Sequence, residues 1–196
     1  MSIWLLGGSI AAIAVALLMT VLARRKIGAR SLPNALRPGS KLPSFSAHSE
    51  TGESVTTEDL LGAPSVIIFV RGNWCPFCTR QVANLIDHYK RINELGARLI
   101  LITPKPLETT RRVAEFFELD FDFWLDDELR IGTQLGLVQE RGVPKSHRGE
   151  YGMDTLWPTS LVMDSAGIIR YASISKFIAD RPDPEKIVGA LRSLAQ

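Results

Sequence analysis

The sequence predicts an α/β domain of three layers with a central mixed sheet, preceded by one transmembrane helix. Three observations lead to this prediction. The stretch from Ile3 to Ala23 contains no charged residue. From residue 65 onward, short apolar runs rich in β-branched residues alternate with segments whose apolar residues recur at helical spacing. Near the carboxyl end, two adjacent strand-like runs and a last helix replace this alternation, so parallel and antiparallel strands are both expected.

The amino-terminal apolar segment is long enough to cross a membrane. At about 1.5 Å per residue, Ile3 to Ala23 spans the roughly 30 Å of a hydrocarbon core. A cleavable signal peptide is one alternative, but it normally has Lys or Arg before the apolar run, and only Met1 and Ser2 precede this one. A buried helix of a globular domain is the other, and it would be apolar all round. We therefore expect residues 1–23 to be a membrane anchor that contacts lipid.

A basic linker is expected to follow at residues 24–41. It carries six positive charges and no acidic residue, and Pro33, Pro38 and Gly39 indicate irregular structure. Positive charge beside a transmembrane end usually stays in the cytoplasm. The pattern predicts a single-pass membrane protein with a cytoplasmic domain, and a periplasmic domain is the alternative.

Residues 42–196 are long enough for one domain with its own core. The overall charge is +2, and subtracting the six positive charges of the linker leaves −4 for this domain. A mildly acidic domain without a basic stripe argues against nucleic acid as a partner.

Local patterns predict the elements of the first half of the domain. Residues 45–55 are typical of a hairpin. The run SVIIFV at residues 65–70 suits a central strand that is covered on both faces. From residue 76 to 96 the apolar positions lie on one helical stripe. The run RLILIT at residues 98–103 predicts a second buried strand.

The second half is expected to continue the alternation and then to end in a hairpin and a helix. The predicted elements are a helix at 108–118, a strand at 121–125, a short helix at 129–135, two strands within 159–173 and a helix from Pro184 to Leu194. The stretch 144–150, which contains His147, is expected to be a loop.

The only two cysteines of the chain, Cys75 and Cys78, are separated by two residues directly after the first buried strand. Three interpretations are open: half of a zinc site, a local crosslink, or a redox couple. A structural zinc site needs four ligands, and the three histidines are isolated in the sequence. A crosslink over so short a loop adds little stability. We therefore favour the redox couple, and we expect no metal and no cofactor.

The position of the cysteines also fits redox chemistry. Cys75 is expected at the N-cap of the helix, with Pro76 at its first position, where unpaired N–H groups favour a thiolate. Cys75 would be the attacking nucleophile, and Cys78 would then form the disulfide. A nearby cation would lower the pKa of Cys75 further, and Arg71 and Arg80 are candidates.

The aromatic neighbours of the cysteines have two interpretations. Trp74 and Phe77 could form an apolar rim that excludes water from the sulfurs and meets a partner, or they could be ordinary packing residues. We favour the rim for Trp74 and leave Phe77 open. Trp157 and Pro158 precede the predicted late strand, and a Trp–Pro bond at a strand start is a reasonable place for a cis peptide.

Three motifs together resemble the alkyl hydroperoxide reductase / thiol-specific antioxidant family of peroxiredoxin-like proteins. They are FVRGNWCPFC, WPTSLVMDSAGIIRYA and DRPDPEKIVGAL. The resemblance runs from about Gly39 to Leu194. It implies a thioredoxin-like fold in which Cys75 reacts with the oxidant and Pro158 is a cis-proline that faces the disulfide. Arg71, Pro76, Phe77 and Trp157 would line the same site.

The sequence departs from the family pattern at the groups that bind the peroxide. Gly72 stands where typical members have a threonine, and Pro158 stands where they have an arginine. Arg71 is a candidate to replace the missing cation. Phe69 stands where thioredoxins bury an acid, so the chain lies between the two families.

Two alternative activities are therefore considered. The first is a membrane-anchored, peroxiredoxin-like antioxidant that reduces hydroperoxides by cycling Cys75 and Cys78 between dithiol and disulfide. The second is a thiol–disulfide oxidoreductase that acts on protein disulfides. Either would need a thiol reductant, which could be a thioredoxin-like protein or a low-molecular-weight thiol. A non-catalytic anchored binding module is the third reading.

Overall fold

The computed structural model describes residues 15, 30–104, 115 and 121–194 of the chain. The chain divides into two units, residues 1–31 and residues 32–196, and the second is described below. The predicted anchor and the predicted helix at 108–118 lie outside the described residues, apart from Val15 and Glu115. Within the part that is described, the structure contains no helix with the length and apolar character needed to cross a membrane.

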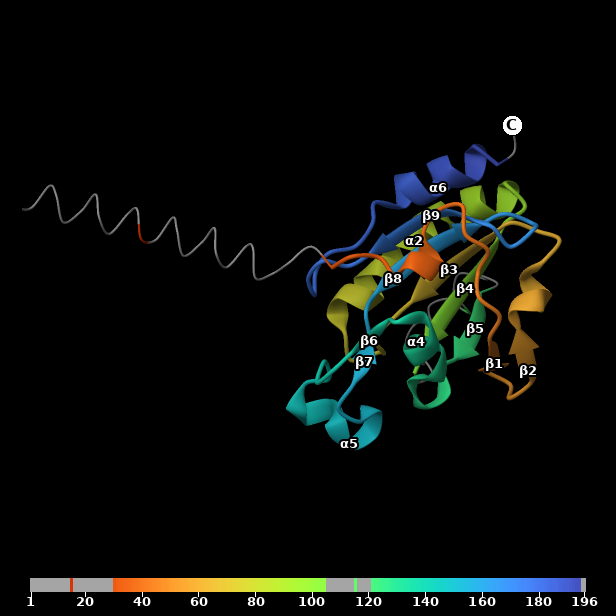
Figure 1. Cartoon of the computed structure of the whole chain (residues 1–196). Helices are drawn as coiled ribbons and strands as arrows, with labels where there is room; N and C mark the ends of the chain where they lie inside the picture. The colour runs from red at the N-terminus through yellow and green to blue at the C-terminus, as the bar shows by residue number, and fades with distance from the viewer. Residues whose placement is uncertain (1–14, 16–29, 105–114, 116–120, 195–196) are drawn as a thin grey trace, which may run out of the picture. The chain divides into compact units, whose positions relative to one another are not determined.

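Seven strands form one mixed sheet in the order β2-β1-β5-β4-β3-β8-β9 (Figure 1). The three central strands β3, β4 and β5 are parallel, and the outer strands pair with them or with each other in antiparallel fashion. The predicted mixed sheet is thus confirmed. The strands are β1 Ser46–Ser49, β2 Ser54–Thr56, β3 Ser65–Phe69, β4 Arg98–Thr103, β5 Asp122–Leu125, β8 Thr159–Met163 and β9 Ile169–Ile174.

Helices cover both faces of this sheet, which gives the three layers that the sequence predicts. Helices α2 (Pro76–Glu94) and α6 (Pro184–Arg192) pack on one face, and α4 (Arg130–Leu135) belongs to the core on the other. All residues of β3 are buried. Side chains alternate between the faces of a strand. Val66 and Ile68 accordingly enter the first core, while Ile67 and Phe69 enter the second.

The remaining elements are short. A second, two-stranded sheet pairs β6 (Val138–Gln139) with β7 (Thr155–Leu156), and α5 (Arg148–Tyr151) lies between them in the chain. Strands of two residues are too short to give a recognisable period, so the sequence does not predict them. The 3-10 helices are η1 Asn34–Leu36, η2 Thr57–Leu60, η3 Asp127–Leu129 and η4 Lys145–His147.

The end of the expected linker packs on the domain. Leu36 is fully buried in the second core. The backbone N–H of Gly39 donates to the carbonyl of Ile169 at 2.7 Å, and that of Leu42 donates to Gly167 at 2.9 Å. These contacts hold residues 36–42 against the start of β9.

A buried carboxylate connects β5 to α4. Asp126 directly follows β5, and its oxygens accept hydrogen bonds from the backbone N–H groups of Ile131 (2.7 Å) and Gly132 (2.9 Å). Burial raises the pKa of the Asp126 carboxyl, although the two N–H groups oppose this. The side chain therefore fixes the start of α4, as polar residues at helix starts commonly do.

Candidate active site

Both cysteines lie at the start of α2, at the carboxyl end of the central strand β3. Cys75 is the N-cap residue and Pro76 occupies the first helical position, as predicted. The carbonyl of Cys75 accepts the first bonds of the helix, from Cys78 N at 2.9 Å and Thr79 N at 3.2 Å. The proline fits because the first N–H of a helix has no intrahelical acceptor.

The two sulfurs form a reduced and buried pair. Cys75 is 0 % exposed, Cys78 is 1 % exposed, and neither is in a disulfide. A hydrogen bond from the Cys78 thiol is the main cause that lowers the pKa of Cys75 to about 6, and it outweighs the opposing effect of burial. The same bond and burial raise the pKa of Cys78 well above its ordinary value. The two opposite pKa shifts favour a negative charge on Cys75 and a proton on Cys78.

A cation that the sequence does not indicate contacts both sulfurs. Nη2 of Arg181 lies 3.3 Å from Sγ of Cys78 and 3.8 Å from Sγ of Cys75. Arg181 belongs to the loop between β9 and α6. It lies inside the DRPDPEKIVGAL motif, but nothing in the motif marks this arginine as part of the site.

Arg71, the cation that the sequence does indicate, is buried beside the site. It is 2 % exposed, and its Nη2 donates to the carbonyl of Gly142 at 2.6 Å. Its guanidinium lies 4.6 Å from the ring centroid of Trp74, within the range of a cation–π contact. Burial lowers the pKa of Arg71, and the charges of Cys75 and Cys78 oppose this. Arg80, the other candidate, is exposed on the surface of α2.

Trp74 lies in a group of aromatic rings. It stacks on His147 with the centroids 5.9 Å apart, and it meets Tyr151 edge-on at 6.4 Å. His147 and Tyr151 come from η4 and α5, within and just beyond the stretch that the sequence predicts to be a loop. Trp74 is half-buried, and its Nε1 has no hydrogen-bond partner among the described residues.

Gly72 has a conformation that explains why no threonine stands there. Its φ is +127°, which side chains rarely adopt. A Cβ at this position would lie 2.7 Å from Cε1 of Tyr151 and 3.0 Å from Nε1 of Trp74. Tyr151 is fixed because its hydroxyl donates to the side-chain oxygen of Asn73. The family threonine would therefore displace the aromatic group.

The other predicted site residues are divided between the site and its surroundings. Pro76 and Phe77 are exposed beside the cysteines. Trp157 packs against the second core, whereas the cysteines belong to the first. The implied cis-proline is wrong, because the peptide before Pro158 is trans. The extended chain here lets Trp157 N donate to the carbonyl of Leu137 at 2.7 Å while the Pro158 carbonyl accepts from Ser175 N at 2.8 Å.

No group of three or more His, Cys, Asp or Glu side chains in the described ranges is arranged to hold a metal ion. Of the four aspartates around β5, Asp126 caps α4, Asp122 pairs with Arg98 at 2.7 Å and Asp127 contacts His48 at 2.7 Å. Asp120 lies outside the described residues.

Comparisons with known proteins indicate the family of the chain. The sequence model of the AhpC/TSA family matches residues 38–172. The chain is 26% identical over 159 residues to a chloroplastic peroxiredoxin Q of Triticum aestivum, and the match covers 81% of this chain and 66% of that protein. It is 28% identical over 138 residues to peroxiredoxin Bcp of Escherichia coli, with 70% of this chain and 85% of that protein covered. The chain thus spans slightly less than two-thirds of the length of the cereal relatives.

Solved structures show the same fold. The crystal structure of peroxidoxin BcpB from Mycobacterium tuberculosis superposes with a TM-score of 0.64 at 20% identity, covering 81% of this chain and 98% of that one. Peroxiredoxin Q from Xanthomonas campestris gives a TM-score of 0.59 at 14% identity, covering 85% and 97%.

The comparisons also correct the localisation that the sequence predicts. Residues 3–23 predict a single-pass membrane protein with its domain in the cytoplasm. The relatives whose names give a location are instead chloroplastic peroxiredoxins, and no described helix could cross a membrane. The prediction of membrane localisation is therefore wrong. The family assignment, in contrast, is confirmed by a match over more than half of the sequence: the chain belongs to the AhpC/TSA family of peroxiredoxin-like proteins in the thioredoxin superfamily.

Proposed function

We propose that this chain is a thiol peroxidase similar to peroxiredoxin Q and Bcp, with Cys75 as the peroxidatic and Cys78 as the resolving cysteine. The observation that carries the proposal is the asymmetry of the dithiol. The pKa of Cys75 is lowered to about 6 beside a neighbour that stays protonated. Since the thiolate is the nucleophile, one sulfur is ready to attack and the other holds the proton that the reaction needs.

The reaction balances with the groups that the site contains. The Cys75 thiolate attacks the terminal oxygen of a hydroperoxide ROOH, which breaks the O–O bond and gives Cys75 sulfenic acid and an alkoxide. The alkoxide takes the proton of the Cys78 thiol and leaves as the alcohol ROH. The Cys78 thiolate then attacks the Cys75 sulfur, forms the disulfide and releases hydroxide. The peroxide has gained two electrons, and the dithiol has lost them.

Unpaired donors beside the sulfurs would bind the oxygens of the peroxide. Nε and Nη1 of Arg71 and Nε1 of Trp74 are buried and have no hydrogen-bond partner among the described residues. Buried donors normally have partners, so an unpaired group of this kind is a candidate to bind a ligand. These side chains would take the part that the family's threonine and arginine play elsewhere, since Gly72 and Pro158 occupy those positions.

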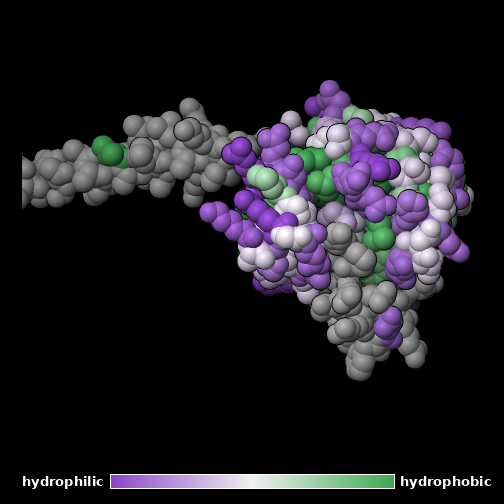
Figure 2. All heavy atoms as spheres, turned by 90° about the horizontal axis from the view of Figure 1, so that it is seen from below, coloured by the Kyte–Doolittle hydropathy of each residue, from purple (hydrophilic) through white to green (hydrophobic). Residues whose placement is uncertain are grey.

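The disulfide must then be reduced again by a thiol, which is either a thioredoxin-like protein or a low-molecular-weight thiol. On the face that Figure 2 shows, apolar areas are small and separated by hydrophilic ones. Phe77 is one of the exposed apolar side chains of the described residues, at 36% exposed between the two cysteines. We propose that it contacts a protein reductant, which is one of the two interpretations that the sequence leaves open for this side chain.

The same exposed Phe77 favours the second candidate function, which is thiol–disulfide exchange with a protein substrate. In that case the Cys75 thiolate attacks a protein disulfide, and Cys78 resolves the mixed disulfide. A purely binding role is the third candidate, and it predicts that Cys75→Ser changes nothing apart from redox titration.

One experiment separates these functions. The fully reduced chain is mixed with one equivalent of hydrogen peroxide, and thiols are counted while Trp74 fluorescence is followed. Loss of both thiols within seconds supports the peroxidase. Cys75→Ser should abolish that loss, and Cys78→Ser should stop at a sulfenic acid that dimedone traps. Thiols that persist for many minutes but exchange with a protein disulfide would reject the peroxidase in favour of the second function.

A further inference from the structure

We propose that Arg181 is a second catalytic cation of the dithiol site, and that the ion-pair network of Glu185 with Arg91 and His88 holds it in position. The proposal deepens the proposed function, because it names a group that acts on the same two sulfurs. It does not require that the oxidant be a hydroperoxide, since both candidate reactions begin with the Cys75 thiolate.

Arg181 is directed at the sulfurs by its own hydrogen bonds. One nitrogen, Nη1, donates to the carbonyls of Asp180 (2.7 Å) and Ile178 (3.0 Å) and reaches the hydroxyl oxygen of Ser175 at 3.3 Å. The other, Nη2, is thereby left to face Cys78 and Cys75. Hydrogen bonds to a charged group are about twice as strong as neutral ones. The contact therefore stabilises a thiolate and, during exchange, whichever sulfur carries the charge.

Hydrogen bonds within the loop that carries Arg181 join its first residues to Asp180. The Ser175 hydroxyl donates to the carbonyl of Asp180 at 2.5 Å, and Lys176 N donates to the Asp180 carboxylate at 2.8 Å. Ser175 N is bonded in turn to the carbonyl of Pro158, next to β8. The arginine is thus presented by a compact turn that is attached to the sheet.

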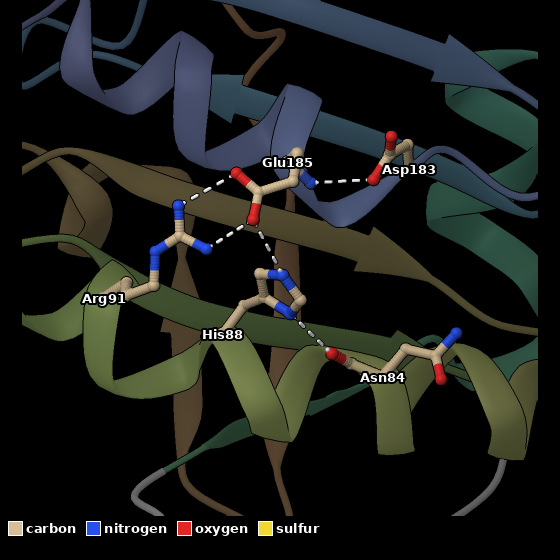
Figure 3. A network of polar contacts seen from close by, with 5 residues as sticks. All are labelled: Asn84, His88, Arg91, Asp183 and Glu185. Carbon is tan, nitrogen blue, oxygen red and sulfur yellow. Dashed lines mark hydrogen bonds and ion pairs between the residues drawn. The ribbon is translucent and has the colours of Figure 1, made fainter.

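The other end of this loop is attached to α2 through the start of α6 (Figure 3). The Glu185 carboxylate accepts from both terminal nitrogens of Arg91, one of them at 2.9 Å, and lies 3.2 Å from Nε2 of His88. Nδ1 of His88 lies 2.9 Å from the carbonyl of Asn84. The pairing with Arg91 is the main cause that lowers the pKa of Glu185 to about 2, so it is ionised over the whole working range.

Arg181 lies only a few residues before Glu185 in the chain, so the ion-pair network is linked to the group that contacts the sulfurs. Asp183 caps α6 by accepting from Glu185 N at 3.0 Å, and only Pro182 separates Asp183 from Arg181. A proline has a nearly fixed φ, so this connection is stiff. Helix α2 therefore carries both the sulfurs and the groups that anchor α6, while α6 anchors the arginine. Loss of the ion pair would let Arg181 move relative to the sulfurs.

The first test measures the acidity of Cys75 in the full chain with Cys78→Ser, where Cys75 is the only thiol and the serine keeps a hydroxyl donor. The pH profile of thiolate absorbance and the rate of alkylation by iodoacetamide are recorded. Arg181→Met should move the midpoint of the thiolate profile up by about one to two pH units, because a hydrogen bond to a charged group is lost, and should slow alkylation most at pH values below the new midpoint. Arg80→Met removes the same charge from the exposed surface of α2 and is the matched control.

Arg181→Lys keeps the charge but loses the planar guanidinium group with its two terminal nitrogens. Its thiolate profile should lie between those of the wild type and Arg181→Met. Profiles for both Arg181 variants that coincide with the Arg80→Met control would overturn the assignment of Arg181. This measurement uses no peroxide. A shifted profile in a chain that does not react with hydroperoxides would therefore reject the proposed peroxidase and leave the assignment of Arg181 standing.

The second test addresses the network. Glu185→Gln removes the ion pair, and Asp87→Asn removes a similar charge from an exposed position on α2 beside His88. We expect Glu185→Gln to shift the thiolate profile in the same direction as Arg181→Met by a smaller amount, with no further shift when the two are combined. A lower melting temperature without any shift of the profile would show a purely structural network and overturn this half of the proposal.

Discussion

Arg181 and Cys78 are 103 positions apart in the sequence, yet a nitrogen of the first lies 3.3 Å from the sulfur of the second. The contact joins the start of α2 to the loop before α6 across the end of the sheet. Two guanidinium groups therefore lie near the dithiol. The second belongs to Arg71, which lies in the chain just before the cysteines. The charge of the site is therefore set by the tertiary fold as well as by the cysteine motif.

The reaction of Cys75 with hydrogen peroxide should depend on pH with a midpoint at about 6. Below this pH the sulfur is protonated and unreactive; above it the rate should reach a plateau, because the raised pKa of Cys78 keeps that thiol protonated. Initial rates measured with the unmodified chain check the value. A midpoint near the ordinary value of 9.0 would contradict the hydrogen bond between the two sulfurs.

The lowered pKa of Cys75 also predicts a pH-dependent stability of the reduced chain. This pKa is lower in the folded than in the unfolded state, so its contribution is complete above the unfolded value of 9.0 and is lost as the pH falls through about 6. Urea unfolding of the reduced chain and of Cys75→Ser should therefore diverge as the pH rises from about 6 to about 9. Parallel stability profiles of the two proteins would refute this.

Arg71→Met should slow the reaction at neutral pH by roughly tenfold to a hundredfold, since it removes a cation and two unpaired donors from beside the thiolate. The free energy of unfolding should also fall, because the substitution leaves the Gly142 carbonyl and the Cys75 thiolate without the guanidinium that faces them. Stopped-flow kinetics and urea unfolding measure the two effects. Arg130→Met, at an exposed ion pair on α4, is the control.

Restoring the family residue with Gly72→Thr should destabilise the fold, by on the order of 1–3 kcal/mol, since the side chain needs a strained φ. It would also collide with Tyr151. Gly149→Thr, at an exposed glycine where an added Cβ would meet no atom within 4 Å, should have little effect. Chemical denaturation compares them. A Gly72→Thr chain that is as stable as the control and reacts faster would contradict the role given to the aromatic group.

The site should prefer small oxidants, because both sulfurs are essentially inaccessible in the reduced state. We expect hydrogen peroxide to react faster than cumene hydroperoxide, on the order of tenfold, which corresponds to about 1.4 kcal/mol in the barrier. The two oxidants also differ in intrinsic reactivity. The ratio of their rates with this chain should therefore be divided by the ratio of their rates with a free low-molecular-weight thiol. Equal corrected rates would mean that the site opens before the oxidant enters.

The sequence predicts the parts of this site that depend on local patterns. The run of β-branched residues at 65–70 predicts β3, and the apolar stripe that begins at residue 76 predicts α2. A proline after Cys75 places that cysteine at the N-cap, because proline is favoured only in the first turn of a helix. The N-cap position of Cys75, the nearby Cys78 and one neighbouring cation thus follow from a few consecutive residues.

The parts that depend on tertiary contacts could not be predicted in this way. Arg181 has the same local signature as any loop arginine, and only the packing of α6 on α2 brings it to the sulfurs. Tyr151 and His147 reach Trp74 through elements of three and four residues, which give no periodic signal. The peptide before Pro158 is trans; Trp157 N bonds to Leu137 and the Pro158 carbonyl accepts from Ser175 N, and neither long-range bond is visible in the sequence.

The match to the family ends at residue 172, before the loop that carries Arg181 begins. A version of this protein cut or fused at residue 174 would keep the family signature and both sulfurs, yet it would lose one of the two guanidinium groups that contact or neighbour them. Any shortened form made for assay or crystallisation should therefore retain the carboxy-terminal helix, or it will report the chemistry of a different dithiol.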